Sequence, residues 1–334
     1  MTKPPVFIVG SARSGTTLLY HSLLSSGGFA DYRTEPAVFD LLIPKFGDMK
    51  KLGNRRRLMQ VWLRSHQYRI SGLRRDQLEA EILSECRTGG DFLRIVMNEI
   101  AQAQNVDRWA VWGPDNLLHL TAIAEALPDA LFIHMIRDGR DVAVSMNKEG
   151  WIRPFPWDHE RRLLVAALHW KWKVEQGRRA GAKVSSRYIE IRFEDLVSTP
   201  ENTLARIGRF MGQDLNYSQI RNNPVGTLRN PNSTFRNLGS AETVAYPIER
   251  WKNLLSESDL VSIESMIGSL LDELGYPRAS GPLQPVNGLS LKLMVTAYPV
   301  FFSSKEWLRS RTPLGRLVSA DRLRLDQCPS PHNG

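Results

Sequence analysis

Residues 6–17 of the chain, VFIVGSARSGTT, join a short apolar run to a loop of small and hydroxyl-bearing residues. The run at 6–9 stands between Pro5 and Gly10, which is typical of a buried parallel strand. A helical stretch follows from Thr16. A loop between a strand and a helix N-terminus holds phosphate through backbone N–H groups. The stretch therefore predicts an α/β fold with a P-loop-like phosphate-binding loop, although a plain turn of glycine and serine remains an alternative.

Strand-like and helix-like segments alternate along the rest of the chain. Further strands are expected at 109–112, 131–136 and 184–193. Helices are expected at 16–24, 116–127, 138–148, 159–180, 200–211 and 257–274. This alternation predicts a three-layer α/β fold, in which helices flank a mostly parallel sheet.

Length and composition indicate an ordinary globular protein. The 334 residues are 42% hydrophobic and 24% charged, which excludes a disordered, collagen-like or coiled-coil chain. The two cysteines, Cys86 and Cys328, lie far apart and favour a reducing compartment, although a single disulfide remains open. Neither a signal peptide nor an apolar run of about 18 residues is visible, so we expect a cytoplasmic location. No CxxC or histidine-rich cluster predicts a structural zinc site.

The net charge of +9 indicates an anionic partner without identifying it. Nucleic acid, a membrane surface and a phosphorylated or sulfated small molecule all fit. Much of the charge lies in two segments that interrupt the strand and helix pattern. One is the stretch from Lys50 to Arg75, with nine basic residues, and the other follows Pro277. We expect insertions or lids there rather than sheet.

The loop differs from that of nucleoside triphosphate enzymes at one position. Its Gly-x4-Gly spacing matches, but Thr16 stands where those enzymes have lysine. The cation is inside the loop instead, at Arg13. The loop therefore favours a phosphate without a distal γ-phosphate and its magnesium.

A second motif follows the strand expected at 131–136. Arg137 stands at its end, and Ser145 follows eight residues later on the next helix. Both can face the crevice in which α/β sheets bind ligands, and arginine offers a two-pronged donor for phosphate. Spacing alone leaves open a surface arginine and a packed serine.

Together the two motifs resemble the sulfotransferases that use 3′-phosphoadenosine 5′-phosphosulfate (PAPS). The resemblance covers residues 5–277 and implies in-line transfer to a hydroxyl of a small molecule, glycan or glycolipid, with 3′,5′-ADP as product. It implies that the 5′-phosphosulfate binds to Arg13, Ser14, Gly15, Thr16 and Thr17. It likewise implies that Arg137 and Ser145 bind the 3′-phosphate. The arginine in the loop is similar to the tyrosylprotein and bacterial branch of the family.

The resemblance also suggests how the chain is divided and how it departs from the family. Residues 1–277 would form the sulfotransferase domain, with a basic insertion at about 45–77, and residues 278–334 an extension that packs on it or closes over it. Relatives often carry a lysine where this chain has Gly113-Pro114-Asp115. Either Arg13 then acts alone or a residue of the insertion supplies the second cation. No metal is expected, because no pair of carboxylates stands beside the loop.

The remaining site residues follow from the same resemblance. Glu35 is the candidate general base, and its place before Pro36 favours an ordered extended segment; a solvated carboxylate is the alternative. Asp115 and His119 are weaker candidates, and His134 is expected in the core. Arg250 and Trp251 lie where the family closes a segment over the nucleotide, although Trp251 also fits a core role.

The acceptor and its relation to the basic segments stay open. The insertion fits either a solvated face or a lid over an acidic or lipid-linked acceptor, and the extension fits either a membrane-surface contact or a lid. The alternatives to a sulfotransferase are a P-loop kinase or NTPase-like enzyme and a non-enzymatic protein that binds anions or nucleic acid. No recognition pattern for nucleic acid supports the latter. The sequence does not determine the oligomeric state.

Overall fold

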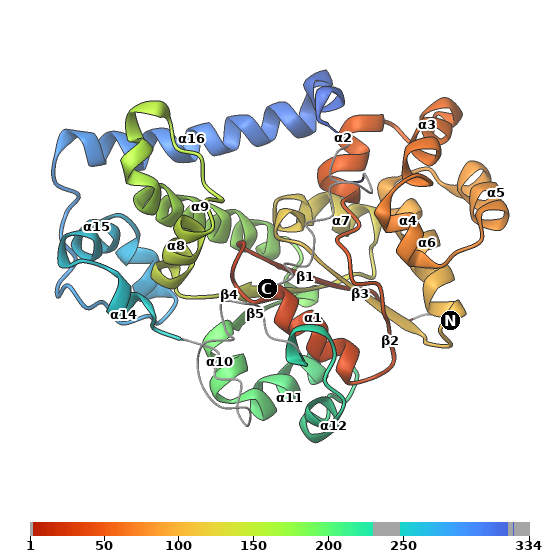
Figure 1. Cartoon of the computed structure of the whole chain (residues 1–334), viewed down its shortest axis with the longest axis horizontal. Coiled ribbons are helices and arrows are strands. Elements are labelled where there is room, and N and C mark those ends of the chain that lie inside the picture. The colour runs from red at the N-terminus through yellow and green to blue at the C-terminus, as the bar shows by residue number, and fades with distance from the viewer. Residues whose placement is uncertain (1–2, 230–247, 320–322, 324–334) are drawn as a thin grey trace, which may run out of the picture.

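The structure is a computed structural model that describes residues 3–229, 248–319 and 323. Its five strands form one parallel sheet at the centre of the molecule (Figure 1). The strands are β1 (Val6–Gly10), β2 (Phe29–Ala30), β3 (Arg108–Trp112), β4 (Leu131–Ile136) and β5 (Tyr188–Arg192). Their order across the sheet is β2-β3-β1-β4-β5, and each pairing is parallel. The predicted α/β class is confirmed.

Strand β1 lies at the centre of the sheet. All five of its residues are buried, as its unbroken apolar run predicts for a strand covered on both faces. It pairs with β3 on one side and with β4 on the other, where Gly10 lies opposite Met135. The chain runs from β1 to β2 and β3 on one side and then crosses to β4 and β5 on the other, so the connections diverge at β1. Parallel sheets bind their ligands at such a divergence, beyond the carboxyl ends of the strands.

The strand expected at 184–193 is shorter than predicted. Residues Ser185–Arg187 form a 3-10 turn before β5 begins at Tyr188. Phe193 already belongs to the next helix. Strand β2 was not predicted, because two residues are too few for a period-2 pattern.

Helices and helical turns connect the strands. The α-helices up to β4 are α1 (Thr16–Ser25), α2 (Ile43–Phe46), α3 (Leu52–Trp62), α4 (His66–Ser71), α5 (Arg75–Glu85), α6 (Gly89–Ala103) and α7 (Leu120–Ala126). Those after β4 are α8 (Gly139–Lys148), α9 (Arg162–Ala182), α10 (Phe193–Ser198), α11 (Pro200–Met211), α12 (Tyr217–Asn222), α14 (Trp251–Leu254), α15 (Glu257–Glu273) and α16 (Leu289–Arg311). A π-helical turn (Val38–Leu42) and 3-10 turns at Pro114–His119, Pro156–Arg161, Gly226–Leu228 and Pro313–Leu317 complete them. The six predicted helices are present, with the first turns of two of them in the 3-10 form.

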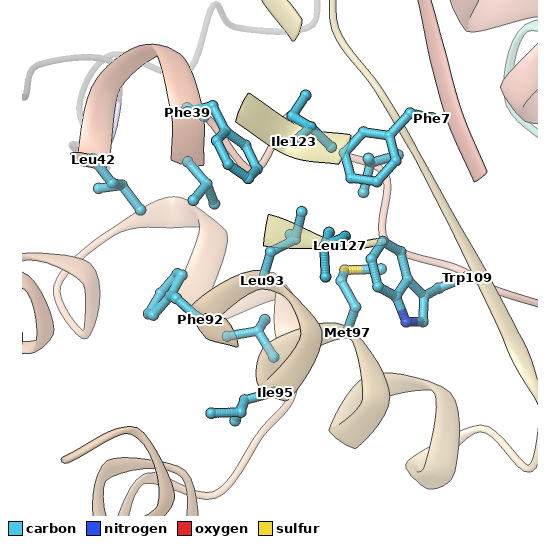
Figure 2. Close-up of a cluster of buried hydrophobic side chains, with 14 of the residues drawn as sticks. Phe7, Phe39, Leu42, Phe92, Leu93, Ile95, Met97, Trp109, Ile123 and Leu127 are labelled. Carbon is cyan, nitrogen blue, oxygen red and sulfur yellow. The ribbon is translucent and has the colours of Figure 1, made fainter. Parts of the chain in front are cut away.

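Apolar clusters cover both faces of the sheet. On one face, Phe7 of β1 and Trp109 of β3 share a cluster with residues of α6 and α7. Figure 2 shows Met97 of α6 and Leu127, which directly follows α7, beside Trp109. On the other face the cluster joins β1 and β4 to α1, α10, α11 and α12. A third cluster holds α8, α9, α15 and α16 together. Three layers result, as predicted.

The basic insertion is helical, and its charges face solvent. It forms α3, α4 and α5, whose apolar residues Leu58, Trp62 and Leu78 join the cluster beside α6. Among the nine lysines and arginines from Lys50 to Arg75 only Arg55 is buried, and its Nη1 donates to the carbonyls of Met49 and Lys50. The helical form agrees with the expectation that this segment adds no strand.

The described residues after 277 pack along α9 rather than standing apart. Figure 1 shows α16 as a long blue helix beside α9. Tyr298 of α16 donates to Asp158 at 3.0 Å and accepts from the N–H of Phe155 at 3.0 Å. No helix in the described ranges is long and apolar enough to cross a membrane. Cys86 is buried as a free thiol, and Cys328 lies outside the described residues.

Candidate functional site

The loop after β1 has the backbone form of an anion cradle. Arg13 has a φ of 69° and Gly15 a φ of 90°, on either side of Ser14, whose N–H donates to the carbonyl of Ser11. Left-handed residues at alternate positions turn successive N–H groups toward one point. Gly15 is also the N-cap of α1 and makes no side-chain cap hydrogen bond. The first N–H groups of α1 are therefore available to an anion.

Two glycines allow this loop to approach its neighbours closely. A Cβ atom on Gly15 would lie 2.4 Å from Cδ2 of Phe193, and one on Gly10 would lie 2.6 Å from the carbonyl oxygen of Met135. The positive φ of Gly15 is a second reason why alanine does not fit at this position. The Gly-x4-Gly spacing thus fits the packing of the loop between β4 and α10.

Buried hydroxyl groups in the loop fit an anionic ligand. Ser11 and Ser14 are fully buried, and the Oγ atom of each lacks a hydrogen-bond partner among the described residues. A buried donor without a partner costs about 1–3 kcal/mol. A phosphate held by the loop would accept from these hydroxyls, so the residues present fit such a group.

Arg137 lies directly beyond the end of β4 and beside the loop. Its Nη1 donates to the carbonyl of Arg13 at 3.3 Å, and its Nη2 lies 3.5 Å from Oδ2 of Asp141. Its guanidinium covers the ring of Phe193 at 4.4 Å. Trp170 of α9 donates to its carbonyl, so Arg137 is held from both sides. The predicted strand-end position of Arg137 is therefore correct.

Ser145 faces the same crevice from α8. Its Oγ accepts a hydrogen bond of 2.9 Å from Nε of Arg13, and only 8% of the residue is exposed. The two sequence motifs thus meet in space. Arg13, Arg137 and Ser145 form one polar cluster at the divergence of β1 and β4.

Positive charge accumulates in this cluster. Burial is the main reason why the pKa of the Arg13 guanidinium lies below its usual value; Glu149 opposes the shift, and Arg137 and Arg250 add to it. Three guanidinium groups are thus close enough to repel one another. An anion with more than one charge would relieve this repulsion.

Glu35 borders the same cavity as the loop. The cavity is lined by Arg13, Gly15, Thr16, Thr17, Glu35 and Arg137, together with six further residues. The Glu35 carboxyl carbon lies 3.8 Å from where a Cβ of Gly113 would be, at the end of β3. The predicted base, the loop and Arg137 therefore share one space.

The segment that carries Glu35 is fixed on both sides. The hydroxyl of Tyr20, from α1, donates to the carbonyl of Tyr32 and accepts from its N–H. The hydroxyl of Tyr32 donates to the carbonyl of Gln67 in α4. The basic insertion therefore supports the Glu35 segment from behind. No residue of 48–76 lines the loop cavity within the described residues, so nothing here supports a second cation from the insertion.

A buried lysine that the sequence analysis missed lies behind the turn at Pro114 and Asp115. Lys173 of α9 is 3% exposed and donates to the carbonyl of Pro114 at 3.1 Å and to Oδ1 of Asp115 at 3.0 Å. Pro114 lines the loop cavity, whereas Lys173 does not. Lys173 therefore holds the turn from behind. Lys173 and Pro114 are 59 residues apart in sequence, so no local motif predicts this contact.

The weaker base candidates lie away from the loop. Asp115 forms an ion pair with Lys173, and His119 is buried with its Nε2 atom 3.5 Å from Glu306 of α16. Burial lowers the pKa of His119 to about 4. Neither residue lines the loop cavity. His134 is fully buried in β4, which confirms the predicted core role.

Arg250 and Trp251 lie beside α8. The N–H of Trp251 donates to Oδ1 of Asp141 at 2.9 Å, and the Arg140 guanidinium lies 3.7 Å from its ring centre. Trp251 is 3% exposed, and its Nε1 atom finds no partner in the described part of the chain. These contacts anchor the start of α14 and keep Arg250 within electrostatic reach of Arg13.

Three further residues complete the cavity, and the sequence analysis assigned none of them to the site. They are Phe193, Trp151 and Thr227. Trp151 lies beside Arg13, whose guanidinium carbon is 5.3 Å from the ring centre. His21 of α1 holds Thr227 through a contact of 2.8 Å between Nδ1 and Oγ1. Phe193 is the first residue of α10, directly after β5.

The arrangement combines anion binding with a carboxylate. Loop residues that include Thr16 and Thr17 line one cavity with Arg13 and Arg137, and Glu35 lines it from another segment. Within the described ranges, no group of three or more His, Cys, Asp or Glu side chains is placed to hold a metal ion. Such a site stabilises negative charge on a transferring group while a base removes a proton.

Solved structures that are similar to the chain include sulfotransferases. A structural search finds the sulfotransferase domain of the Synechococcus PCC 7002 olefin synthase, with 17% identity, 91% of this chain and 96% of that chain covered, and a TM-score of 0.46. It also finds the sulfotransferase STF1 from Mycobacterium tuberculosis H37Rv, with 20% identity, coverage of 66% and 70%, and a TM-score of 0.42. A retinol dehydratase in complex with androsterone and the inactive cofactor PAP has 16% identity, coverage of 80% and 81%, and a TM-score of 0.40.

Sequence comparisons give the family directly. No curated protein matches the chain at a significant level. A family model described as "Sulfotransferase family" matches residues 4–219, which span β1, the loop, Arg137, Ser145 and the Phe193 segment. Because this match covers about two thirds of the 334 residues, the chain belongs to the sulfotransferase family.

Proposed function

We propose that this chain is a PAPS-dependent sulfotransferase that modifies a hydroxyl group. The observation that carries the proposal is the single cavity shared by the loop, Arg137 and Glu35 at the divergence of β1 and β4. When bound, PAPS supplies the sulfuryl group that the acceptor hydroxyl takes up. The residues of the chain then have to hold two anionic ends and remove one proton.

The loop and the two arginines divide the binding work in this proposal. Arg13, the N–H groups at Ser14 and Gly15, and the hydroxyls of Thr16 and Thr17 hold the 5′-phosphosulfate. Arg137 and Ser145 hold the 3′-phosphate. Fixed donors that face a developing charge are worth more in a buried site than in water. A sulfuryl group carries less charge than a phosphoryl group, so these donors suffice in this proposal without a metal ion.

Glu35 is the proposed general base. It lines the cavity beside Thr17 and is carried by a segment that Tyr20 and Tyr32 fix in place. A base has to lie within hydrogen-bond reach of the proton it takes, and an ordered segment favours that geometry. The carboxylate accepts the proton of the acceptor hydroxyl and releases it to solvent.

Arg250 and Trp251 are proposed to complete the nucleotide site. Arg250 acts on Arg13 electrostatically, which places its charge near the loop. The N–H of Trp251 is tied to Asp141, and Asp141 also contacts Arg137. Arg250 and Trp251 are therefore connected through Asp141 to Arg137, the proposed ligand of the 3′-phosphate. We keep residues 1–277 as the proposed sulfotransferase domain and residues 278–334 as its extension.

The alternative of a P-loop kinase or NTPase is less well supported. A triphosphate loop needs a lysine at the position of Thr16 and a carboxylate for magnesium. The cavity is lined by two arginines and no lysine among the described residues. The alternative of a non-enzymatic nucleic-acid-binding protein would depend on the exposed basic side chains of α3–α5. It would not explain the loop cavity.

Thermal stabilisation distinguishes these functions. A ligand at 100 times its Kd stabilises the folded state by about 2.7 kcal/mol. We expect 3′,5′-ADP to raise the Tm by several degrees and ATP with magnesium to have no comparable effect. Stabilisation by ATP with magnesium alone would contradict the proposal. A shift with any duplex DNA that salt abolishes would favour the nucleic-acid alternative.

A further inference from the structure

A second cavity adjoins the loop cavity. It has a volume of about 370 Å³, which is within the range of small-molecule sites. Trp151 lines both cavities. The consecutive residues Pro114 and Asp115 line one cavity each. A molecule in the second cavity therefore has one end beside the loop and Glu35.

The walls of this second cavity are aromatic. Helix α9 contributes His169 and Trp172, and α16 contributes Phe301 and Phe302. The ring of Phe302 lies 5.0 Å from that of His169 and 5.4 Å from that of Trp172, measured between centroids. Trp172 also donates to the hydroxyl of Ser303 at 3.0 Å. These contacts form the cavity without a ligand, so an apolar ring system finds a preformed surface.

The charges around this cavity are unequal. Four basic and two acidic side chains line it. Lys173 is paired with Asp115, and Arg309 with Glu306 at 2.8 Å. The other two basic residues, Arg153 and Lys305, form no salt bridge with any described residue and are exposed to solvent. The rim therefore carries two positive charges that no carboxylate of the cavity neutralises.

The wall formed by α16 belongs to the extension of the chain. The matched family region ends at residue 219, whereas α16 begins at Leu289. Tyr298 fixes α16 to the segment before α9 through Asp158 and the N–H of Phe155. The extension thus adds an aromatic and basic wall beside a site built from the family region.

We propose that this second cavity binds the acceptor, and that the acceptor is a small molecule with an apolar ring body and an anionic group. The inference rests on the proposed sulfotransferase function and specifies its substrate class. The ring body packs against the surface that Trp172 and Phe302 form together. The anionic group lies toward Arg153 and Lys305, while the hydroxyl points past Trp151 toward Glu35. The anionic group stays unchanged in the reaction and serves for recognition.

Binding of a fluorescent anion tests this inference apart from catalysis. The probe is 1-anilinonaphthalene-8-sulfonate, with the neutral N-phenyl-1-naphthylamine as its uncharged counterpart, and both are titrated with and without 3′,5′-ADP. The variant is R153E combined with K305E, since both side chains are exposed and their replacement should leave the fold intact. K292E is the matched control, because Lys292 is an exposed lysine of α16 that does not line the cavity.

We expect the double charge reversal to weaken binding of the anion about tenfold and to leave the neutral probe within twofold. K292E should leave both affinities unchanged. Equal anion affinity in the wild type and the double variant would overturn the inference, as would displacement of the anion by 3′,5′-ADP. Stabilisation by 3′,5′-ADP is measured on the same samples. If 3′,5′-ADP does not stabilise the protein but anion binding still depends on the two charges, the proposed cofactor is wrong and the anion site is supported. The failure of the proposed function and the failure of this inference are therefore distinguishable.

Discussion

Nε of Arg13 donates a hydrogen bond of 2.9 Å to Oγ of Ser145, across 132 residues of sequence. The bond joins the loop that follows β1 to the helix that follows β4. These two strands are neighbours in the sheet, and the connections diverge at β1. The contact therefore links the two sequence motifs where parallel sheets bind ligands.

Removing the Ser145 hydroxyl should weaken nucleotide binding more than it weakens the fold. Ser145→Ala loses one hydrogen bond, worth about 0.5–1.5 kcal/mol. We expect the affinity for 3′,5′-ADP to fall about 5- to 10-fold and the Tm to change by little. Calorimetric titration and a melting curve measure both. An unchanged affinity would show that Ser145 only positions Arg13 in the free protein.

The loop should not tolerate a methyl group at Gly15. Gly15→Ala places a Cβ atom 2.4 Å from the ring of Phe193 and adds the backbone cost of a positive φ. That backbone cost is about 1–2 kcal/mol. We expect a larger loss of stability than this and loss of binding to 3′,5′-ADP, measured by urea unfolding and calorimetry.

Gly72→Ala is the matched control for this substitution. Gly72 also has a positive φ, 67°, but no other atom lies within 4 Å of the added Cβ. Its variant should lose only the backbone cost of about 1–2 kcal/mol and should bind 3′,5′-ADP normally. Equal effects at Gly15 and Gly72 would mean that the contact with Phe193 does not constrain the loop.

The role of Glu35 is tested by removing its charge without changing its shape. Glu35→Gln should lower turnover about 100-fold or more, as the loss of a general base does, and should leave the affinity for 3′,5′-ADP within twofold. Release of 3′,5′-ADP from PAPS, with cell extract as the source of acceptor, measures turnover. Undiminished turnover would exclude Glu35 from the reaction.

Buried His21 should make stability depend on pH. Burial is the main reason why its pKa is lowered from 6.5 to about 4, with Arg33 contributing. The unfolded chain therefore binds more protons than the folded chain between pH 6.5 and 4, so stability is full above pH 6.5 and falls as the pH decreases. From pH 7 to 5.5 the loss is about 1 kcal/mol.

His21→Asn serves to isolate this contribution. The asparagine lacks the titration but keeps an acceptor near Thr227, which His21 now holds at 2.8 Å. Urea unfolding at pH 7 and 5.5 should show a smaller loss in the variant than in the wild type, by about 1 kcal/mol. The same loss in both proteins would mean that His21 is not the group that titrates.

Much of the fold is predictable because its signals are local. The apolar run before the loop predicts β1, and Pro200 at the first turn fixes the start of α11. Strand β5 is shorter than predicted because Ser185–Arg187 folds into a 3-10 turn. The apolar character of Val184 does not reveal that turn. The two residues of β2 are held by pairing with β3, which no local pattern encodes.

The residues of the candidate site likewise fall into those that local sequence signals predict and those that they do not. Arg13, Arg137 and Ser145 stand at fixed places relative to strand ends, so their position beside the loop follows from the topology. Lys173 and Trp151 reach the site through packing of α9 and of the segment after α8. Their contacts depend on helix placement, not on spacing within a motif. The sequence signal for Lys173 was a lysine within the largely apolar stretch of α9.

The most direct test of a nucleotide site with two anionic ends is the contribution of the 3′-phosphate. Calorimetry compares 3′,5′-ADP with 5′-AMP, which lacks only that phosphate. If Arg137 and Ser145 bind it, 3′,5′-ADP should bind at least about 100-fold more tightly, because charge-assisted hydrogen bonds contribute about 1.5–3 kcal/mol each. Equal affinity for the two nucleotides would contradict the account.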